Sequence, residues 1–298
     1  MLNHKQCEAF LAVAETGSFD AAAEHLHITA SAVTLRIQSL EKNLGQMLLV
    51  RERPCRTTPA GLALMQHLQH SRLLEQQFIQ NLQGQTDHAG FYQLNIATND
   101  DSLATWLVPL LQQTVLEESI CLHLQIDDQT QTHHLLEAGL VSACISTEEK
   151  AMKGCIAAPL GSMHYRMVCT PQFAQQWFPQ GVYREALRKA PAVIYNRKDQ
   201  FHGDILLKHF GLQQSSYPHH FIPSSHIFAQ AICSSLGYGM LPDYQSMPYL
   251  KDGTLIEILP ELRTDMHLYW HHWKQQSVQL QKLTQVLTQQ AAIQMNQY

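Results

Sequence analysis

The sequence has no long apolar run and no cysteine pattern of the kind that binds metals or forms a disulfide scaffold. No apolar run approaches about 18 residues, the length that a membrane-spanning helix needs, and no basic and then apolar leader opens the chain. The seven cysteines are odd in number and never form Cys-x-x-Cys, which argues against disulfide staples and a cysteine-rich zinc site. These absences predict a cytoplasmic protein with no membrane partner.

Positive charge is also scarce. The chain carries 20 basic and 25 acidic residues, a formal net charge of -5, so its overall charge does not point to nucleic acid. The 18 histidines form no His-Glu-x-x-His motif or comparable ligand spacing. No Ser/His/Asp, Cys/His or glycine-rich phosphate motif is present either. We therefore predict no bound metal, no cofactor and no enzymatic activity.

The 298 residues favour two domains, and the first is organised around residues 18–45. Apolar spacings of three, four and seven place a buried stripe on each of two short helices. His27-Ile28-Thr29 fits a tight turn between them, and either Thr29 or Ser31 is placed to cap the second helix. A helix braced in this way has the geometry that enters a DNA major groove. The same spacing also fits a simple helix pair with a solvated face.

The flanks of this helix pair favour DNA binding. A further helix is predicted over residues 5–15. After residue 45, a short apolar run and then Arg51, Arg53 and Arg56 predict a two-stranded wing with arginines at its tip, placed to contact phosphates. An exposed charged hairpin without a partner is the alternative. Thr58 and Pro59 then open a long helix to about residue 83, whose apolar stripe favours dimerisation.

From about residue 90 the pattern changes to alternating strands and helices. Strands are predicted over residues 92–98, 120–126 and 141–146, with helices over 102–118 and 132–138, so a parallel sheet is expected. The second half predicts strands over 165–169, 192–195, 221–222, 239–241, 255–258 and 266–273, and helices over 171–177, 200–209, 224–236 and 277–295. Two such groups predict two α/β lobes with a cleft between them.

Fixed residues at fixed spacing run through residues 4–88. They are Ser18-Phe19-x-x-Ala22-Ala23-x-x-Leu26-x-Ile28-Thr29-x-Ser31-Ala32-Val33-Thr34, Leu40-Glu41-x-x-Leu44-Gly45-x-x-Leu48-Leu49-x-Arg51 and Thr58-Pro59-x-Gly61. This set resembles the N-terminal signature of LysR-type transcriptional regulators. The resemblance implies an α/β protein with a winged helix-turn-helix at 1–57, a dimerising linker helix at 58–88 and a periplasmic-binding-protein-like effector domain at 89–298. Its lobes would comprise about 89–160 with 266–298, and about 161–265.

A second set of residues resembles the arginine- and lysine-responsive subgroup of that family, the activators of arginine export. They are Asn99-x-Asp101-Ser102-Leu103-Ala104-Thr105-Trp106-Leu107-x-Pro109, Leu124-Gln125-x-x-Asp128-x-Thr130, Phe178-Pro179-x-Gly181-Val182 and Tyr269-Trp270-His271. The resemblance implies a homodimer or homotetramer that binds a double-stranded DNA operator, acts with RNA polymerase on genes of amino-acid transport or metabolism, and takes lysine or arginine as effector.

Other functions remain open at this point. One is an effector-independent, nucleoid-type DNA-binding protein, and another is a LysR-type regulator that senses a different small molecule. Redox sensing through Cys144 and Cys155 is a third possibility. A solute-binding protein is disfavoured by the missing leader.

The candidate DNA contacts lie on the second helix and on the wing. Ser31, Thr34 and Arg36 are the candidates on the helix, and Arg51, Arg53 and Arg56 those on the wing. Arg36 is able to grip a guanine edge with two hydrogen bonds or to clamp a phosphate. The chain departs from the family at Ala30, where Gln is usual, and at Thr34-Leu35, where Ser-Arg or Ser-Gln is usual. Ala30 cannot hydrogen-bond a base edge but is able to touch a thymine methyl group.

The candidate effector site lies beyond the carboxyl ends of the first two strands of the effector domain, where ligands of such sheets bind. The candidates are Asn99, Asp100, Ser102, Asp127, Asp128, Thr130 and, from the second lobe, Ser224. The helix expected to start at Ser102 would offer free amides to a carboxylate, and an aspartate would hold a cationic side chain. Alternatively, Asp100 caps the helix and Asp127-Asp128 form a solvated turn. Trp106 is expected in the core.

Overall fold

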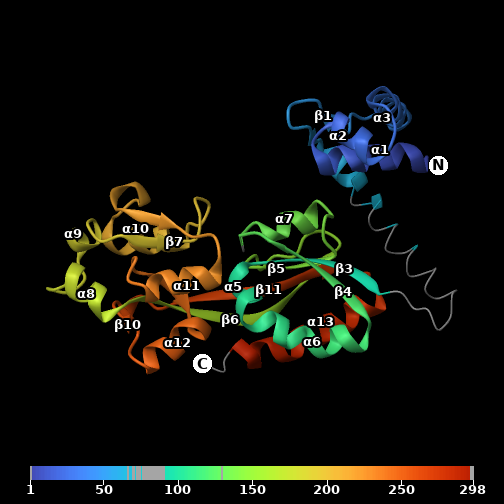
Figure 1. Ribbon diagram of the computed structural model, residues 1–298. Coiled ribbons are helices and arrows are strands. Elements are labelled where there is room, and N and C mark those ends of the chain that lie inside the picture. The colour runs from blue at the N-terminus through green and yellow to red at the C-terminus, as the bar shows by residue number, and fades with distance from the viewer. Residues whose placement is uncertain are drawn as a thin grey trace. The chain divides into compact units, whose positions relative to one another are not determined.

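The computed structural model describes residues 2–65, 67–68, 71, 75, 91–128 and 130–295 (Figure 1). The chain divides into two compact units, an N-terminal unit at Met1–Ala89 with Glu137–Gly139 and a C-terminal unit at Gly90–Leu136 with Leu140–Tyr298. Each unit has its own apolar core, so we describe each by itself. No helix in the described ranges is long and apolar enough to cross a membrane.

The N-terminal unit contains three helices and a small hairpin. The helices are α1 (His4–Thr16), α2 (Phe19–His25) and α3 (Ala30–Leu44), and the strands are β1 (Leu49–Val50) and β2 (Arg56–Thr57). Each helix begins at a polar cap: the side chains of Asn3, Ser18 and Thr29 accept hydrogen bonds from backbone amides of the first turn. Thr29, rather than Ser31, therefore caps the second helix of the pair.

Apolar residues on the inward faces of the three helices form the core of this unit. Phe10, Val13, Val33, Ile37 and Leu40 are almost completely buried. Burial at positions 33, 37 and 40 follows the spacing of four and three that places residues on one helix face. The opposite face of α3 is therefore free, as the helix-turn-helix expectation requires.

The hairpin after α3 is held by a buried carboxylate. Strand β1 pairs antiparallel with β2, which confirms the predicted wing. Glu41 on α3 is 6% exposed, and its Oε1 accepts hydrogen bonds from the amides of Leu48 and Leu49 at 2.9 and 3.4 Å. Because an unpaired buried carboxylate is costly, these bonds fix where the wing leaves the helix.

The long helix predicted from Thr58 is described only at its start. Residues 59–65 are helical, and the Thr58 hydroxyl accepts a hydrogen bond from the amide of Gly61 at 3.0 Å. Most of the predicted continuation to residue 83, and with it most of the proposed dimerisation stripe, lies outside the described residues.

The C-terminal unit alternates strands and helices. Its strands are β3 (Tyr92–Thr98), β4 (Ile120–Ile126), β5 (Ala143–Ser146), β6 (Cys155–Cys169), β7 (Ala192–Ile194), β8 (His219–Phe221), β9 (Gly239–Pro242), β10 (Ile256–Glu257) and β11 (Thr264–Trp273). Its α-helices are α5 (Asp100–Ser102), α6 (Val108–Glu117), α7 (Thr132–Glu137), α8 (Pro171–Trp177), α9 (Arg184–Leu187), α10 (Phe201–Phe210), α11 (Ser225–Cys233), α12 (Asp243–Lys251) and α13 (Val278–Met295). Helices α9 and α12 were not predicted, and Pro248 inside α12 explains why a helix was not expected there.

Seven strands form one mixed sheet in the order β10-β6-β11-β5-β3-β4, with β9 also paired to β6. Strand β3 pairs parallel with β4 and β5, as the alternation predicted. Strands β11, β6, β9 and β10 join antiparallel, so the sheet as a whole is mixed. A separate pair, β7 and β8, is parallel.

The strand β6 is much longer than the predicted strand at 165–169. It begins at Cys155 and pairs with β11 as far as Tyr165, then with β9 and β10 (Figure 1). Pro159 and Gly161 break the usual strand pattern, and the ladder shifts register beside them, between Leu268 and Tyr269 of β11. Strands β6 and β11 thus run from the first lobe into the second.

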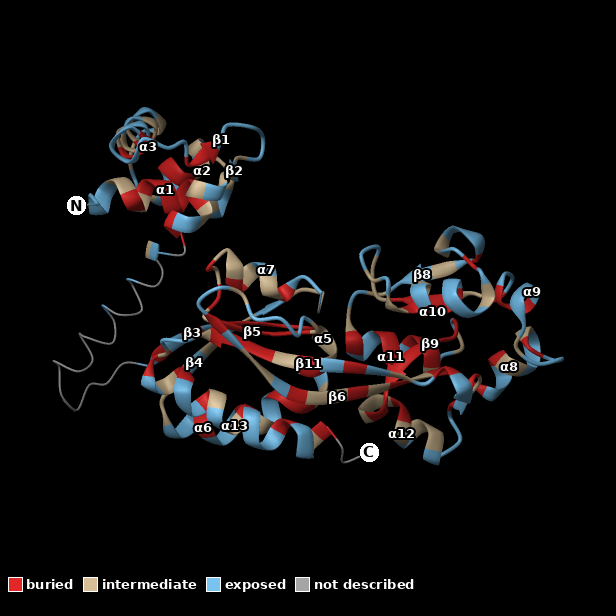
Figure 2. Ribbon diagram, turned by 180° about the vertical axis from the view of Figure 1, so that it is seen from behind, coloured by how far each residue is buried: buried red, intermediate tan, exposed pale blue. Residues whose placement is uncertain are grey.

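Helices cover the first lobe. Helices α6 and α13 lie together against one face of the sheet, while α7 lies on the other (Figure 1). Buried residues follow the sheet strands and the inner sides of these helices (Figure 2). Trp106 and Trp270 are both completely buried in this core, which confirms the prediction for Trp106.

The helix after β3 begins earlier than predicted. Helical backbone starts at Asp100, not at Ser102, and continues through a π-helical turn, Leu103–Leu107, into α6. The two acidic residues therefore form the first turn of the helix rather than the loop before it. Wide π turns of this kind often accompany functional sites.

Gly61 offers a test of the packing between the long helix and the wing. A Cβ at Gly61 would lie 2.0 Å from the carbonyl oxygen of Leu48, a contact that only a backbone shift relieves. We expect Gly61→Ala to destabilise the N-terminal unit by about 3 kcal/mol or more in urea unfolding. Gly203→Ala is the matched control, since Gly203 is also helical but meets no described atom within 4 Å. Equal effects of the two substitutions would contradict the packing.

Candidate functional site

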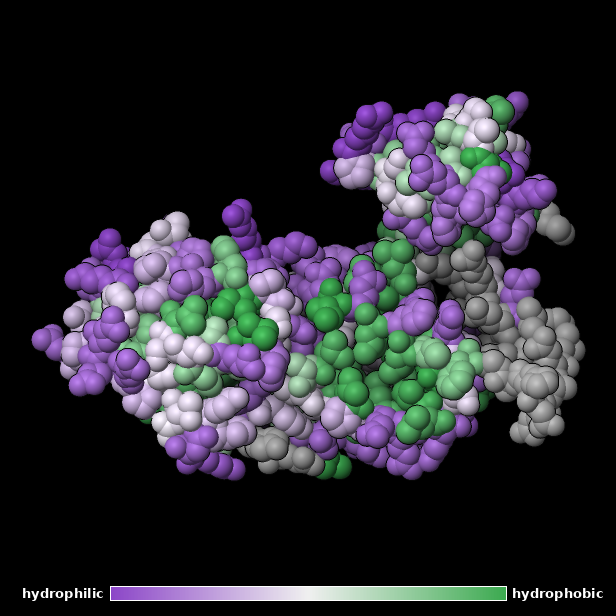
Figure 3. Space-filling model, in the orientation of Figure 1, coloured by the Kyte–Doolittle hydropathy of each residue, from purple (hydrophilic) through white to green (hydrophobic). Residues whose placement is uncertain are grey.

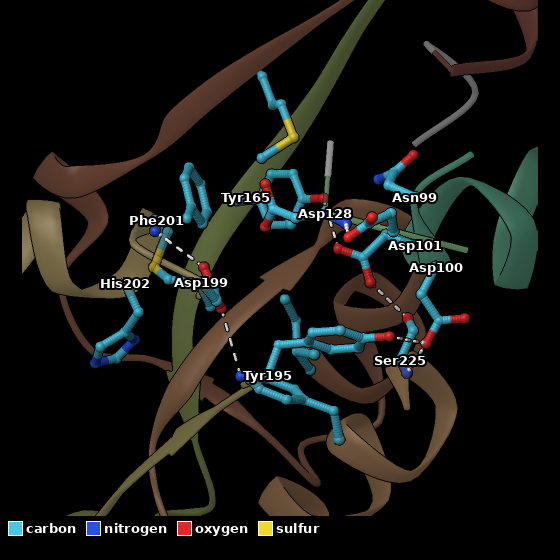
Figure 4. Close-up of a pocket in the computed structure, with 15 residues that line it drawn as sticks. Asn99, Asp100, Asp101, Asp128, Tyr165, Tyr195, Asp199, Phe201, His202 and Ser225 are labelled. Carbon is cyan, nitrogen blue, oxygen red and sulfur yellow. Dashed lines mark hydrogen bonds between the residues drawn. The ribbon is translucent and has the colours of Figure 1, made fainter. Parts of the chain in front are cut away.

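A cavity lies where the two lobes of the C-terminal unit meet (Figure 4). It is lined by acidic, aromatic and apolar residues from both lobes: Asn99, Asp100, Asp101, Asp127, Asp128, Tyr165, Tyr195, Asp199, Phe201, His202, Ser225, Phe228, Met240, Leu241 and Met266. Five of these are aspartates, and no lysine or arginine lines the cavity in the described part of the chain. His202 does not supply a positive charge, because burial lowers its pKa to about 4.

Asp100 joins the lobes by two hydrogen bonds. Its Oδ2 accepts one from the Tyr195 hydroxyl at 3.1 Å and one from the Ser225 amide at 2.6 Å. Tyr195 follows strand β7, and Ser225 is the first residue of α11. The Asp100 carboxylate thus accepts a hydrogen bond from the first amide of α11, at the helix end that carries partial positive charge and favours anions.

Asp101 makes a second set of bonds across the same boundary. Its Oδ2 accepts from the Tyr165 hydroxyl at 2.6 Å, and its Oδ1 accepts from the Ser225 hydroxyl at 2.5 Å. Gln245 supports this bond by donating to the Ser225 hydroxyl oxygen at 2.9 Å. Burial raises the pKa of Asp101 and neighbouring Asp100 adds to the rise, although the hydrogen bonds from Ser225 and Tyr165 oppose it.

Asp199 brings a further carboxylate from the second lobe. Its two oxygens accept hydrogen bonds from the amides of Phe201, at 2.9 Å, and Tyr195, at 3.4 Å. Burial raises the pKa of Asp199 to about 6, and the negative charges of Asp128 and Asp101 contribute. Three carboxylates from both lobes therefore act on one another across the cavity.

Asn99 presents the clearest unsatisfied polar group. The residue is 2% exposed, and neither its side-chain oxygen nor its nitrogen has a hydrogen-bond partner among the described atoms. It occupies the cap position before Asp100 but makes no side-chain cap bond. A buried amide without partners is costly, so a ligand with both a donor and an acceptor would find a prepared partner here.

The outward face of α3 carries the candidate DNA contacts of the helix. Ser31 is exposed and shares a hydrogen bond with the Thr29 hydroxyl at 2.9 Å. The Thr34 hydroxyl donates to the carbonyl oxygen of Ala30 at 2.9 Å, which keeps the side chain close to its own helix. Arg36 is partly exposed.

The wing places its arginines at the surface. Arg51 lies 3.7 Å from the Glu41 carboxylate and 5.6 Å from the centre of the Phe19 ring, two contacts that restrict its guanidinium. Arg53 and Arg56 are exposed. A surface depression brings Thr34 of the helix together with Arg51 and Arg53 of the wing. The candidate residues of both elements thus share one surface, with Arg36 and Arg56 outside the depression.

Comparisons with known proteins agree with both units. Residues 4–62 match the family described as bacterial regulatory helix-turn-helix protein, lysR family, and residues 89–292 match the LysR substrate binding domain. The chain belongs to the LysR family of transcriptional regulators. It is a DNA-binding regulator with an effector-binding domain, as the sequence predicted.

Relatives within the LysR family match nearly the whole chain. The transcriptional regulator ArgP of Vibrio parahaemolyticus is 38% identical over 290 residues, 97% of each chain. Two solved structures each match over 98% of this chain and 98% of their own. They are a crystal structure of ArgP from Mycobacterium tuberculosis (35% identity, TM-score 0.81) and full-length LysG from Corynebacterium glutamicum with bound effector Arg (30% identity, TM-score 0.77). The predicted resemblance to the arginine- and lysine-responsive subgroup is confirmed.

The structure of this LysR-family chain brings four of the seven predicted effector residues to the cavity: Asn99, Asp100, Asp127 and Asp128. Thr130 lies beside it and donates from its hydroxyl and amide to Asp128.

The other two predicted effector residues lie off the cavity. Ser102 is completely buried and donates to the sulfur of Met163 at 3.7 Å. Ser224 occupies the cap position before α11, and its neighbour Ser225 is the residue that lines the cavity.

Several lining residues were missed by sequence reasoning. Tyr165, Tyr195 and Ser225 donate the bonds that join the lobes, whereas Asp199 accepts its bonds within the second lobe. Of the lining residues that were not predicted, Asp101 and Ser225 each lie next to a predicted position. Tyr195 ends the predicted strand at 192–195 and Asp199 follows it, so the rule that ligands bind beyond strand ends could have found them. It was applied to the first lobe alone.

Proposed function

We propose that this LysR-family regulator binds a cationic amino acid, arginine or lysine, between the two lobes, and that binding changes its action at operator DNA. The observation that carries the proposal is the acidic cavity, in which five aspartates meet without a lysine or arginine among the described residues. The bound Arg in the related LysG supports the same ligand class.

Charge repulsion gives the cation a way to drive closure of the lobes. Asp199 belongs to the second lobe, whereas Asp101 and Asp128 belong to the first, and their charges raise the pKa of Asp199. Bringing like charges together in a partly buried site costs free energy unless a cation is present. A cationic ligand therefore has higher affinity for the closed arrangement, which is the condition for a ligand to shift a population.

The lining residues fit the other parts of an amino acid. The unpaired amide of Asn99 offers a donor to an α-carboxylate and an acceptor to an α-ammonium group. Phe228, Met240, Leu241 and Met266 supply apolar surface for the aliphatic stem of the ligand.

For the N-terminal unit we propose that Ser31, Thr34 and Arg36 face the major groove and that Arg51, Arg53 and Arg56 contact phosphates of the operator. The shared surface of Thr34, Arg51 and Arg53 supports this arrangement. RNA polymerase and further copies of the chain complete the proposed partners. Apolar side chains gather over β4 and α6 (Figure 3), where Val108, Leu116 and Ile126 are exposed, which supports self-association.

Burial argues against redox sensing through Cys144 and Cys155. Both residues are almost completely buried. Burial raises the pKa of both thiols, that of Cys155 to about 11, so neither is a reactive thiolate at neutral pH.

Titration calorimetry with arginine and citrulline, its neutral analogue, tests the charge requirement. We expect heat with arginine and none with citrulline. We expect Asp199→Asn to weaken arginine binding by roughly 10- to 100-fold, because a charged contact is lost. Asp204→Asn is the control, since Asp204 is an exposed acidic residue of the same region outside the cavity. Equal binding of arginine and citrulline would contradict the proposal.

The affinity for arginine should also depend on pH. Asp199 has a pKa of about 6, so it is protonated in the free protein below that pH and must release a proton when a cation binds. Arginine affinity should therefore fall as the pH decreases from 7 to 5, by up to about tenfold per unit below pH 6. Asp199→Asn should remove most of this dependence.

Comparison of arginine with agmatine, which lacks the carboxylate, tests the role of Asn99. We expect Asn99→Ala to weaken arginine binding about tenfold, because hydrogen bonds to a charged carboxylate are lost. The variant should lose less affinity for agmatine than for arginine, because agmatine keeps the ammonium group but has no carboxylate. An equal loss for both ligands would instead place Asn99 away from the carboxylate end.

Arg36 tests the DNA part of the proposal. We expect Arg36→Ala to weaken operator binding by roughly 1–3 kcal/mol if the side chain reads a base, with a smaller loss on random DNA. Gel-shift titrations on both DNAs at several salt concentrations measure the difference. The same loss on both, with a shallower salt dependence, would identify a phosphate contact instead.

A further inference from the structure

Leu35 is an exposed apolar residue in the middle of α3. It is 66% exposed, more than any other large apolar residue in the described part of the N-terminal unit, where Met47 follows at 59%. Single exposed leucines are common on protein surfaces, so exposure alone carries no meaning. The position of Leu35 on the helix is what makes its exposure informative.

Leu35 belongs to the face of α3 that points away from the core. Ser31, Leu35, Gln38 and Lys42 are all exposed and follow one another at steps of four, three and four. Such steps place residues along one side of a helix. Val33, Ile37 and Leu40 are buried on the other side. In a helix-turn-helix protein the outward side of this helix is the one that meets the base edges.

The fold itself does not require leucine at this position. Leu35 is absent from the apolar core of the unit and from the partly buried residues packed against it. Glutamine, lysine or arginine would serve the helix about as well, because their helix propensities are close to that of leucine. The Leu35 side chain is therefore available for contact with a partner outside the unit.

The chemistry of the major groove restricts that contact to one kind of base edge. Guanine, adenine and cytosine present hydrogen-bonding groups there, and a leucine that displaced their water would leave those groups unpaired. Thymine also presents a C5 methyl group, the one apolar group on a normal base edge. Contact between that methyl group and Leu35 would remove apolar surface of both partners from water.

We propose that Leu35 is a specificity-determining residue that recognises the C5 methyl group of a thymine in each half of the operator. The polar residues beside it, Ser31 and Gln38, are able to pair with several bases, so Leu35 would restrict the choice at its own position. The same chemistry extends to 5-methylcytosine, which carries its methyl group at the same place. The proposal does not depend on the effector.

The test removes methyl groups one at a time from bound DNA. The probe is the tightest duplex selected by the full-length protein from a random library, in which each thymine is replaced in turn by deoxyuridine. At one symmetry-related pair of positions, uracil should lower the affinity of the unchanged protein about fourfold per methyl group. At that pair the Leu35→Ala protein should bind both duplexes equally.

Two controls keep the result specific. Met47→Ala removes an exposed apolar side chain of the same unit that lies outside α3, and it should keep the full uracil effect. The unfolding midpoint of Leu35→Ala should match that of the unchanged protein, because the side chain is largely exposed. A duplex with 5-methylcytosine at the sensitive position should bind tighter than one with cytosine, and Leu35→Ala should abolish that difference.

Each other outcome overturns the proposal. If no position separates Leu35→Ala from the unchanged protein, Leu35 does not read a methyl group. If Leu35→Ala weakens selected and random DNA equally, the side chain makes a contact that is not sequence-specific. If the uracil effect persists in Leu35→Ala and disappears in Met47→Ala, the methyl group is recognised by the wing side of the unit.

Discussion

The structure of the effector-binding unit depends on holding several negative charges close together between its lobes. Asp100 and Asp101 are satisfied by donors from the far side of the cleft, the amide and hydroxyl of Ser225 and the hydroxyl of Tyr195. Asp199 meets their charges from the second lobe. Hydrogen bonds offset part of the cost of this arrangement, and a cation would offset the rest. Under the proposed function, the cation therefore couples ligand recognition to lobe closure.

The backbone makes this concentration of charge possible. Strands β6 and β11 pass from one lobe to the other, so the lobes share a sheet yet meet only along a cleft. Tyr165 lies on β6 where its partner changes from β11 to β9, and there it donates to Asp101. The early start of the helix at Asp100 turns both aspartates into its first residues, at the end of strand β3. The cavity is therefore lined by residues from the end of the strand, from the helix and from the crossover.

The DNA-binding unit carries different kinds of side chain on its wing and on its outward-facing helix. Three of its arginines lie on the wing, where Glu41 and Phe19 restrict Arg51, and the proposed role of the charge there is attachment to phosphates. The outward face of α3 carries polar side chains and one apolar side chain, that of Leu35. The proposed contact of Leu35 with a methyl group would add discrimination among bases to the polar contacts.

Local patterns in the sequence determined the helices of the N-terminal unit, the strands β3 and β4, and the candidates Asn99, Asp100 and Asp128. These features depend on side-chain periodicity, capping and strand ends, which involve residues near one another in the chain. The first half of β6 was missed because Pro159 and Gly161 contradict strand character locally, and only pairing with β11 overrides them. The partners Tyr195, Asp199 and Ser225 lie about a hundred residues from Asp100. Only the tertiary structure decided that they meet, because two loops become neighbours through the packing of the whole chain between them.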